Sequence, residues 1–378
     1  MKDIVIAGYA RSPFHFATKG ALTKVRPDDL AAHVVKGLME RTGVNPDDVE
    51  DLILGCAFPE GEQGFNMARL VGLMAGLPIS VAGTTVNRFC GSSMQAIHMA
   101  AGALQMGAGD VFICAGVESM SRVPMSGFNP MPNPALCESM PAAYMSMGET
   151  AENVGREYSI SREEQEVFAV TSQHKAGEAQ TKGLLADEIV PIEVGGHSIE
   201  EDGCLRPTTD LEGLAGLKLA FDENGTVTAG TSSPLTDGAA ATLVCSLDYA
   251  NANSLTPIAR IAGIAVSGCK PETMGLGPIF SSRKALSRAG IEAKDLDVVE
   301  INEAFATQSI ASIRDLELDT AKVNIDGGAI AIGHPLGATG ARITGKAAQL
   351  LKRQGGRYAL STQCIGGGQG IATVLEAA

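Results

Sequence analysis

Basic side chains are scarce relative to acidic ones in this 378-residue chain. Lys and Arg number 29 against 43 Asp and Glu, which gives a formal net charge of −14, and no run of like charges occurs. Nucleic-acid binding depends on a basic surface that displaces counterions. The composition therefore excludes nucleic acid as the main partner. An anionic small molecule remains compatible, because it needs only a local basic patch.

Long apolar runs and metal-type cysteine spacings are also missing. No stretch approaches the roughly 18–20 apolar residues of a membrane span. The start Met-Lys-Asp-Ile-Val-Ile-Ala places an acid inside a short strand-like run, unlike a signal peptide. The cysteines form no Cys-x-x-Cys pair and no metal-like spacing with histidine; they are Cys56, Cys90, Cys114, Cys137, Cys204, Cys245, Cys269 and Cys364. We expect reduced thiols in the cytoplasm and no metal site.

Glycine, in contrast, is abundant. The 45 glycines make up about 12% of the chain, against a usual ~7%, and they cluster beside strand-like runs. Such runs at 4–7, 52–54 and 111–115 alternate with helical patterns at 28–40 and 94–106. This alternation is typical of parallel strands with crossover helices. The sequence therefore predicts an α/β enzyme, with a length that suits two to three domains.

An internal repeat indicates two similar halves. The segment Arg-Thr-Gly-Val-Asn-Pro-Asp-Asp-Val from Arg41 aligns with Arg-Ala-Gly-Ile-Glu-Ala-Lys-Asp-Leu from Arg288. Both read as a helix end closed by glycine and followed by an acidic turn and a strand. Val86-Asn87 and Val323-Asn324 then each open a strand, a turn and a helix. We predict a first half at 1–255 and a second half at 256–378.

The first half contains a segment of different character. Residues 121–144 are rich in Met, Pro and Asn, and 193–212 are polar and turn-rich. Between them, Ser161-Arg-Glu-Glu is a capping box that starts a helix. We predict an insertion from about 119 to 245 that covers the first half, because long insertions are usually lids or binding loops.

Four segments combine nucleophilic or basic side chains with glycine. Cys90 follows a β-branched run and precedes a helix, where N–H donors and the macrodipole favour a thiolate. His334 lies in Gly-His-Pro between glycines, as a rigidly held base would. Cys364 ends a strand and faces consecutive glycine N–H groups, a plausible oxyanion nest. Asn302 and Glu303 follow the strand 298–301. The structural alternatives are a buried cysteine, a packed strand crossing and a helix N-cap.

These four segments resemble the thiolase family. Cys-Gly-Ser-Ser, Asn-Glu-Ala-Phe, Gly-Gly-Ala-Ile-Ala-x-Gly-His-Pro and Cys-x-Gly-Gly-Gly-x-Gly occur in the family's order and spacing, and the resemblance extends from Ile4 to Glu376. It implies a five-layered αβαβα fold built from two similar halves, with a loop domain inserted in the first. It also implies a homodimer or homotetramer that acts on acyl-CoA and coenzyme A. Coenzyme A is then a co-substrate, and no cofactor stays bound.

The resemblance assigns roles to individual residues. Cys90 is the nucleophile that accepts the acyl group, and His334 is the base that takes its proton. Cys364 moves protons to and from the substrate α-carbon or the departing thiol. Asn302 holds a water that forms one oxyanion hole with His334, and the N–H groups of Cys90 and Gly366 form the other. Sulfur suits the nucleophile because transfer between two thioesters is close to isoenergetic.

The same comparison implies contacts with coenzyme A and the acyl chain. Arg206 corresponds to the position that packs on the adenine, and Ser233 to the one that touches the pantetheine. The apolar lining positions correspond to Phe221 and Phe305, and the residues flanking the acyl pocket to Met147 and Met274.

Some positions depart from the family pattern, and they bear on the reaction. Asp326 replaces an asparagine and either adds charge near the active-site floor or hydrogen-bonds its turn. Pro234 replaces a small residue, and the stretch 193–205 is short. Ser146 replaces the histidine of short-chain biosynthetic thiolases. This favours the degradative branch, which cleaves 3-ketoacyl-CoA with coenzyme A in fatty-acid β-oxidation, over an acetyl-CoA C-acetyltransferase that forms acetoacetyl-CoA.

Other protein classes fit the residues less well. A nicotinamide-dependent dehydrogenase would carry Gly-x-Gly-x-x-Gly after its first strand, where this chain has Gly-Tyr-Ala-Arg-Ser-Pro from Gly8. A condensing ketoacyl synthase shares the fold but generally lacks a second cysteine like Cys364. A thiolase-like scaffold or lipid carrier without activity would not need all four catalytic side chains.

Overall fold

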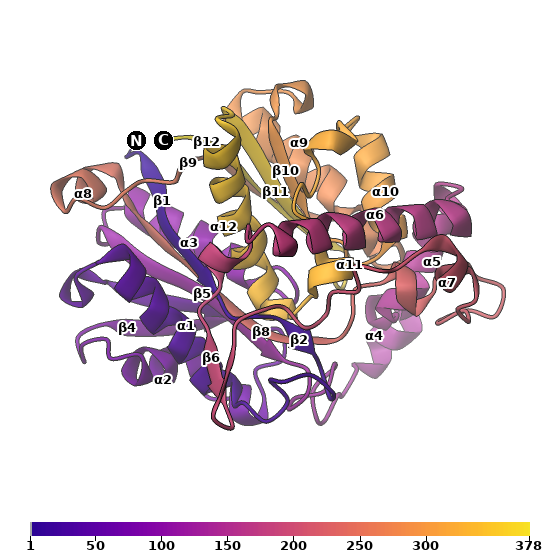
Figure 1. The fold of residues 1–378 in the computed structure, drawn as a ribbon, viewed down its shortest axis with the longest axis horizontal. Coiled ribbons are helices and arrows are strands. Elements are labelled where there is room, and N and C mark those ends of the chain that lie inside the picture. The colour runs from indigo at the N-terminus through magenta and orange to yellow at the C-terminus, as the bar shows by residue number, and fades with distance from the viewer. Residues whose placement is uncertain (1) are drawn as a thin grey trace.

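The computed structural model describes residues 2–378, and its largest element is a mixed ten-stranded sheet (Figure 1). The short strand β2 (His15–Phe16) pairs with β8 beside the main path. From one edge to the other, the order is β10 (Val298–Ile301), β11 (Tyr358–Ile365), β12 (Gln369–Ala377), β9 (Ala259–Gly268), β1 (Ile4–Arg11), β8 (Thr236–Ser246), β5 (Val111–Ser119), β3 (Asp51–Gly55) and β4 (Ala82–Val86).

The strand order repeats between the two halves of the chain. Inward from its edge, the first half has β4, β3, β5, β8 and β1, and the second has β10, β11, β12 and β9. The counterpart of β4 is reduced to one parallel bridge between Val299 and Val323. The halves join where β1 pairs with β9 at Val5–Arg260 and Ile6–Ala259.

Glycine closes the equivalent helix in each half, as the repeat predicts. Helix α1 (Pro27–Thr42) ends at Gly43 with φ 69°, and α9 (Gly277–Ala289) ends at Gly290 with φ 71°. This left-handed conformation is unfavourable for residues with a Cβ. A short 3₁₀ turn then leads into β3 in one half and β10 in the other.

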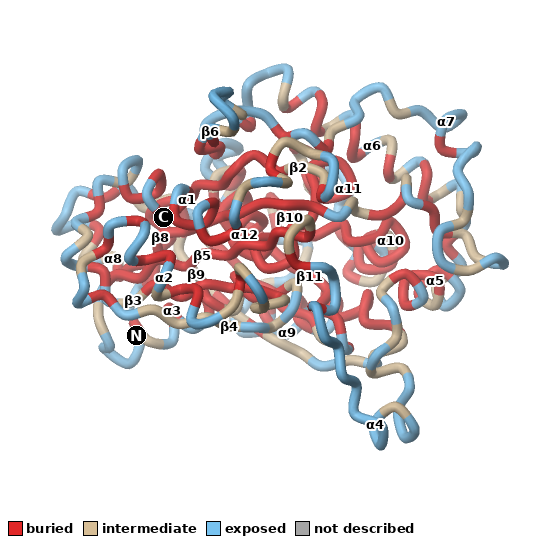
Figure 2. The backbone as a smooth tube through the Cα atoms, turned by 90° about the horizontal axis from the view of Figure 1, so that it is seen from below, coloured by how far each residue is buried: buried red, intermediate tan, exposed pale blue. Residues whose placement is uncertain are grey.

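Helices divide the molecule into five layers. Helices α1 and α2 (Met67–Met74) cover one face of the first-half strands, and α9 and α10 (Ala306–Asp315) pack on the second half. Between the two sets of strands, α3 (Ser92–Gln105) packs against α12 (Leu336–Gln354). In Figure 2, α12 is drawn mostly in the red of buried residues. The predicted αβαβα architecture is confirmed.

The prediction of parallel strands is correct for only part of the sheet. Strands β3, β4 and β5 are mutually parallel, as are β10 and β11. The pairs of β8 with β1 and β5, and those of β12 with β9 and β11, are antiparallel. Local alternation of strands and helices indicates βαβ units, but it does not determine how strands distant in sequence pair.

The inserted segment contacts the first half, as expected, and also packs on the second half. Val190 N–H donates to the Arg11 carbonyl at 2.7 Å on the first half, whereas the inserted helices at 147–157 and 162–181 pack against α10 and α11 (Ala329–Ile332) of the second half. The predicted range 119–245 also includes β8, a central strand of the sheet. The inserted elements are α4 (Pro134–Ser139), α5 (Met147–Glu157), α6 (Arg162–Thr181), β6 (Ile192–Val194), β7 (His197–Ile199) and α7 (Leu211–Ala215). Helix α8 (Leu247–Ala252) follows β8.

The predicted capping box starts α6. Glu164 N–H donates to Ser161 Oγ at 3.2 Å, and Ser161 N–H donates to the Glu164 carboxylate at 3.0 Å. These bonds satisfy two helix-terminal donors. The sequence therefore predicted where α6, the longest helix of the insertion, begins.

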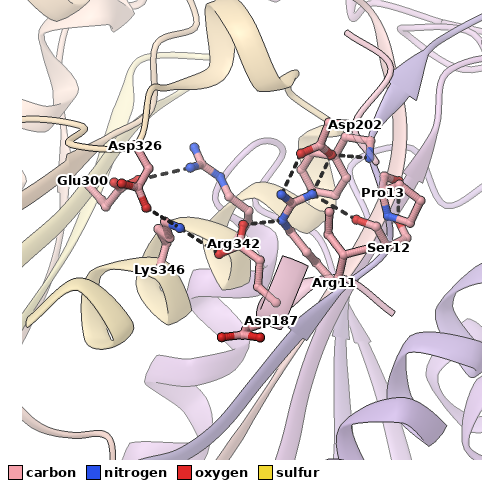
Figure 3. Close-up of polar contacts among 12 residues, drawn as sticks. Arg11, Ser12, Pro13, Asp187, Asp202, Glu300, Asp326, Arg342 and Lys346 are labelled. Carbon is pink, nitrogen blue, oxygen red and sulfur yellow. Dashed lines mark hydrogen bonds and ion pairs between the residues drawn. The ribbon is translucent and has the colours of Figure 1, made fainter. Parts of the chain in front are cut away.

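A chain of buried ion pairs links the insertion to both halves (Figure 3). Arg11 on β1 contacts Asp202 at 2.6 Å and Glu188 at 2.7 Å. Lys346 on α12 contacts the same Glu188 at 3.0 Å and Asp326 at 2.7 Å. We call this set, completed by Arg353 on Asp326, the ion-pair chain.

The ion-pair chain accounts for the departure at Asp326. Burial raises the pKa of this carboxyl, but bonds from Arg353 and Lys346 outweigh burial and hold the pKa below its ordinary value. Both donors lie on α12. The aspartate therefore binds this helix by ion pairs, beyond the turn contact that the sequence suggested.

Candidate active site

Cys90 lies in a tight turn between β4 and α3. Phe89, directly before it, has φ 44°, a conformation that bulky residues rarely adopt. Three bonds hold this turn: Phe89 N–H donates to Asn87 Oδ1 at 2.8 Å, Arg88 N–H to Ser92 Oγ at 2.9 Å, and Gln363 Nε2 to the Cys90 carbonyl. Cys90 is therefore presented on a rigid turn just before a helix, as the sequence predicted.

The expected thiolate at Cys90 is not the resting form. Although the residue is partly accessible, burial among protein atoms raises the pKa of the thiol to about 11. Hydrogen bonding from the backbone N–H groups of Gly366 and Cys90 lowers it only in part, and the charge of Glu118 raises it further. At neutral pH the sulfur is protonated, so a nucleophilic role needs a neighbouring base.

His334 lies between α11 (Ala329–Ile332) and α12, held on every side. Gly333 before it has φ 111°, and a Cβ there would come within 2.7 Å of the Thr236 side chain. The His334 N–H donates to Thr236 Oγ1 at 3.0 Å. On the ring, Nδ1 lies 2.6 Å from Thr339 Oγ1, and Nε2 lies 3.3 Å from Asn302 Nδ2. Such a histidine cannot rotate freely.

Burial, with a smaller contribution from Arg342, lowers the pKa of His334 to about 3. The ring is therefore neutral at physiological pH and has a lone pair available. A neutral imidazole is the form that acts as a base.

Asn302 directly follows β10 and is fully buried. Its N–H donates to the Thr362 carbonyl at 3.0 Å, and its Oδ1 has no protein partner within residues 2–378. The N-cap of the following helix α10 is Phe305, so the alternative that Asn302 caps this helix is wrong. The unpaired amide oxygen is free to bind a water or a substrate group.

Glu303, beside Asn302, accepts hydrogen bonds that hold three segments of the chain together. Its carboxylate accepts from Ser172 Oγ at 2.5 Å, Asn324 Nδ2 at 2.7 Å and Ile330 N–H at 3.1 Å. These donors belong to α6, to the strand-like turn at 324 and to α11. The residue therefore joins the insertion to the loop that carries His334.

Cys364 is the second-to-last residue of strand β11 and is buried. Burial raises the pKa of its thiol, and the nearby sulfur of Cys90 raises it further. The two cysteines thus lie within electrostatic reach of each other. Met147, Met274 and Phe305 form one apolar cluster with Cys364. The structure brings together the residues that the resemblance assigns to the acyl pocket.

The glycine turn after Cys364 connects β11 to β12. Gly367 and Gly368 have φ 79° and 85°, and a Cβ on Gly368 would lie 2.5 Å from the Cys269 carbonyl. The N–H group of neighbouring Gly366 lowers the pKa of the Cys90 thiol, as does the N–H group of Cys90 itself. Both N–H groups of the predicted oxyanion hole therefore act on the same sulfur.

The candidate coenzyme A contacts lie on the insertion and around the end of β10. Phe221 meets Phe305 edge to face, with ring centroids 5.9 Å apart. Ser233 N–H donates to the Ala304 carbonyl at 2.9 Å, which places its loop beside Asn302. Arg206 is exposed, with its guanidinium 4.9 Å from the centre of the Phe16 ring. Phe16 was not anticipated from the sequence.

Glu118 is a further site residue that sequence reasoning missed. Its buried carboxylate accepts from Ala57 N–H and Gln63 Nε2 at 2.8 Å each, and from Gly337 N–H at 2.9 Å. Glu118 thus joins β5, the loop after β3 and the start of α12, all near Cys90. An acid inside an otherwise apolar strand was the available signal.

Metal-type clusters and membrane-spanning helices are both absent from residues 2–378. Across residues 2–378, no group of three or more His, Cys, Asp or Glu is arranged to hold a metal ion. No helix in that range is both long and apolar enough to cross a membrane.

Family models match both halves of the chain. The model for the thiolase N-terminal domain matches residues 4–248, and that for the thiolase C-terminal domain matches 255–377. The chain belongs to the thiolase family. This identification agrees with the fold and with two cysteines, a histidine and an asparagine gathered around glycine turns.

Particular relatives carry a more specific name. A 3-ketoacyl-CoA thiolase of Bacillus subtilis (strain 168) is 46% identical, with full coverage of both chains. One of Marinomonas sp. (strain MWYL1) is 49% identical, covering 99% of this chain and 98% of that protein. The crystal structure of human mitochondrial 3-ketoacyl-CoA thiolase in complex with CoA superposes with a TM-score of 0.93 at 38% identity, covering 100% of this chain and 98% of the other.

Proposed function

We propose that this protein is a 3-ketoacyl-CoA thiolase. It cleaves 3-ketoacyl-CoA with coenzyme A to give acetyl-CoA and an acyl-CoA shortened by two carbons, and the reaction is reversible. The observation that carries the proposal is a buried, neutral His334 held between Asn302 and Thr339, in a fold that also places the thiol of Cys90 beside Gly366 and Cys364. The names of the relatives support the same substrate class.

In the first half-reaction, the Cys90 proton passes to His334 and the sulfur attacks the 3-keto carbon. The oxyanion formed there is stabilised by hydrogen-bond donors of the site. The C2–C3 bond then breaks, leaving the acyl group on Cys90 as a thioester and an enolate of acetyl-CoA. Cys364 donates its proton to C2 of that enolate. The raised pKa of Cys364 suits this step, because the thiol is protonated when the carbanion forms.

In the second half-reaction, coenzyme A enters and gives its thiol proton to the Cys364 thiolate. Its sulfur attacks the acyl thioester, and the tetrahedral intermediate collapses with departure of the Cys90 sulfur. That sulfur recovers its proton from His334. The N–H groups of Cys90 and Gly366 form one oxyanion hole, and a water held by Asn302, together with His334, forms the other. No electrons are gained or lost overall.

The resemblance to thiolases supplies the substrate contacts of this proposal. Arg206, one face of which covers Phe16, offers its other face to the adenine, and Ser233 contacts the pantetheine. Phe221 and Phe305 line the channel, and Met147 and Met274 flank the acyl chain. Flexible methionines accommodate chains of different length, which favours 3-ketoacyl-CoA of several lengths over acetoacetyl-CoA alone.

We further propose that the protein acts in the cytoplasm as a homodimer formed through β4. This strand is an edge of the sheet, and the apolar side chains of Phe65 and Ile79 are 93% and 82% exposed nearby. Unpaired edges and exposed apolar patches favour association. A homotetramer would require a second surface, such as the exposed arm around α4 (Figure 2). Sedimentation equilibrium distinguishes these states from a monomer.

Trapping the intermediate tests the proposed activity. After brief exposure to acyl-CoA without free coenzyme A, mass spectrometry is expected to find one acyl group on Cys90. The Cys90→Ser variant is expected to lose this adduct and thiolysis, since a hydroxyl is a far weaker nucleophile at neutral pH. An adduct only on Cys364, or on no cysteine, would contradict the proposal.

A chain-length series separates the two candidate reactions. We expect kcat/KM for 3-ketoacyl-CoA esters to stay level or rise beyond six carbons. Activity confined to the four-carbon ester would identify an acetyl-CoA C-acetyltransferase instead.

A further inference from the structure

The hydroxyl of Thr339 bonds to His334 Nδ1, on the opposite side of the ring from Asn302. Thr339 lies in the first turn of α12, five residues after the histidine. Its Oγ1 is 2.6 Å from Nδ1 and 3.1 Å from the Pro335 carbonyl, and the side chain is fully buried.

One placement of the hydrogens satisfies both partners of Thr339 Oγ1. A threonine hydroxyl has one hydrogen, and the Pro335 carbonyl can only accept. With that hydrogen donated to Pro335, the lone pairs of Oγ1 face His334, so Nδ1 carries the ring hydrogen. On the other side, Asn302 Nδ2 donates to Nε2 at 3.3 Å. Both contacts fit one tautomer, with the hydrogen on Nδ1 and the lone pair on Nε2, where it accepts from Asn302 until it takes the Cys90 proton.

We propose that Thr339 is a positioning residue that fixes His334 in the Nδ1–H tautomer, so that Nε2 is the base for the Cys90 proton. The inference rests on the proposed function and adds a residue to it. When His334 takes the proton, both ring nitrogens carry hydrogen. The Nδ1–H bond to Thr339 then becomes charge-assisted and stronger, so the hydroxyl stabilises the transient imidazolium.

A neutral partner at this position has a chemical consequence. In Ser-His-Asp triads a buried carboxylate performs the orienting task and stabilises the imidazolium strongly. Here a hydroxyl orients the ring with no added negative charge. The imidazolium is correspondingly less stable, and the proton returns readily to sulfur when Cys90 leaves. This suits a reversible enzyme that must expel the same thiol it deprotonates.

Three variants of the full-length protein test the assignment. Thr339→Val keeps the shape but removes the oxygen, and Thr339→Ser keeps the hydroxyl. Thr344→Val is the matched control, because it removes a buried hydroxyl of the same helix that contacts Ser361 at 3.1 Å. We expect kcat to fall about 10–100-fold in Thr339→Val, part of the ~10²–10⁴ that a positioned base supplies. KM should stay within about twofold, and Thr339→Ser and Thr344→Val should stay within about threefold of the wild-type kcat.

Direct observation of the tautomer provides a second readout. With ¹⁵N-histidine labelling and a His334→Asn spectrum for assignment, Nδ1 of His334 should be protonated in the wild type and in Thr339→Ser. In Thr339→Val the two tautomers should mix. Wild-type kcat in Thr339→Val, an equal loss in Thr344→Val, failure of serine to rescue, or a hydrogen on Nε2 in the wild type would each overturn the inference.

The outcomes also separate this inference from the proposed function. If the wild-type protein forms no acyl adduct on Cys90, the proposed function fails. If it forms the adduct and Thr339→Val forms it equally fast, only the role of Thr339 fails.

Discussion

Helix α12 borders two buried polar regions that differ in charge: the side chains of one are neutral, and those of the other are ionised and paired. At its start, the active site contains His334, Asn302 and two thiols, all neutral at physiological pH. Further along the same helix, Lys346 and Arg353 take part in the ion-pair chain with Asp326, Glu188 and, through it, Arg11.

The difference lies in whether a buried charge has a partner. Burial penalises every charge. In the ion-pair chain, each charged group meets an opposite one at hydrogen-bond distance, so its ionised form survives. In the active site no such partner is available, and the pKa of Cys90 rises while that of His334 falls. In the neutral site, charge forms on Cys90 and His334 only during the reaction. The ion-pair chain is charged at rest and holds the insertion and the two halves in place.

The largest expected effect tests the neutral region. Cys364→Ala should reduce thiolysis by about 10²–10⁴, the usual contribution of a positioned acid or base. Acylation of Cys90 by a simple thioester, which generates no carbanion, should fall much less. Stopped-flow measurement of the two half-reactions checks this. Cys269→Ala, which changes a neighbouring cysteine with no assigned role, is the control. Equal loss of both half-reactions in Cys364→Ala would show that this thiol supports nucleophile activation instead.

The next largest effect tests the charged region. Arg11→Met should lower the free energy of unfolding by about 3–5 kcal/mol, because it leaves Asp202 and Glu188 buried without this partner. Urea unfolding followed by circular dichroism measures the change. Adding Asp202→Leu to the variant should recover part of the loss. A loss below about 1 kcal/mol would mean that water replaces the guanidinium without penalty.

Acid should destabilise the protein through its buried neutral histidines. Burial lowers the pKa of His334 to about 3, and burial with nearby arginines does the same for His98, which contacts Thr373. The unfolded chain binds these protons below about pH 6.5, so the stability contributed by the neutral rings is present above that pH. It is lost as the pH falls towards 3.

Linkage gives a loss of about 2 kcal/mol per histidine between pH 7.5 and 5. In His98→Gln, which keeps a polar partner for Thr373, the drop in unfolding free energy over this range should shrink by that amount. An unchanged drop would show that His98 is not neutral in the folded state.

The smallest effect belongs to an exposed ion pair. Lys36 and Glu40 lie 4.0 Å apart on α1 with side chains 63% and 68% exposed. Lys36→Ala should change the free energy of unfolding by less than about 0.5 kcal/mol, since solvent screens such pairs. It should leave thiolysis unchanged. If Lys36→Ala lowered the free energy of unfolding as much as Arg11→Met does, buried and exposed ion pairs would contribute equally to stability, contrary to our expectation.

Local sequence signals predicted the parts of the structure that local physics determines. Gly43 and Gly290 marked helix ends because left-handed backbone favours glycine, and Ser161 with Glu164 marked a helix start. The sequence also predicted that Cys90, His334 and Cys364 lie at glycine turns. It did not predict that the Cys90 thiol is protonated, because this state depends on atoms that tertiary packing places around the sulfur. Thr339 was missed for a similar reason: its bond to His334 requires the turn at Pro335 to close.

Among the strands of the sheet, β1 is made before both of its neighbours, β8 and β9. Its residues pair with 240–246 of β8 and with 259–260 of β9, so most of the chain must be made before either partner exists. At usual rates of synthesis this interval is on the order of 10–50 s. During that time an apolar strand has both hydrogen-bonding edges unpaired, which is a template for aggregation. We expect the yield of folded protein in overexpression to depend on how well nascent β1 is shielded while the ribosome completes the chain.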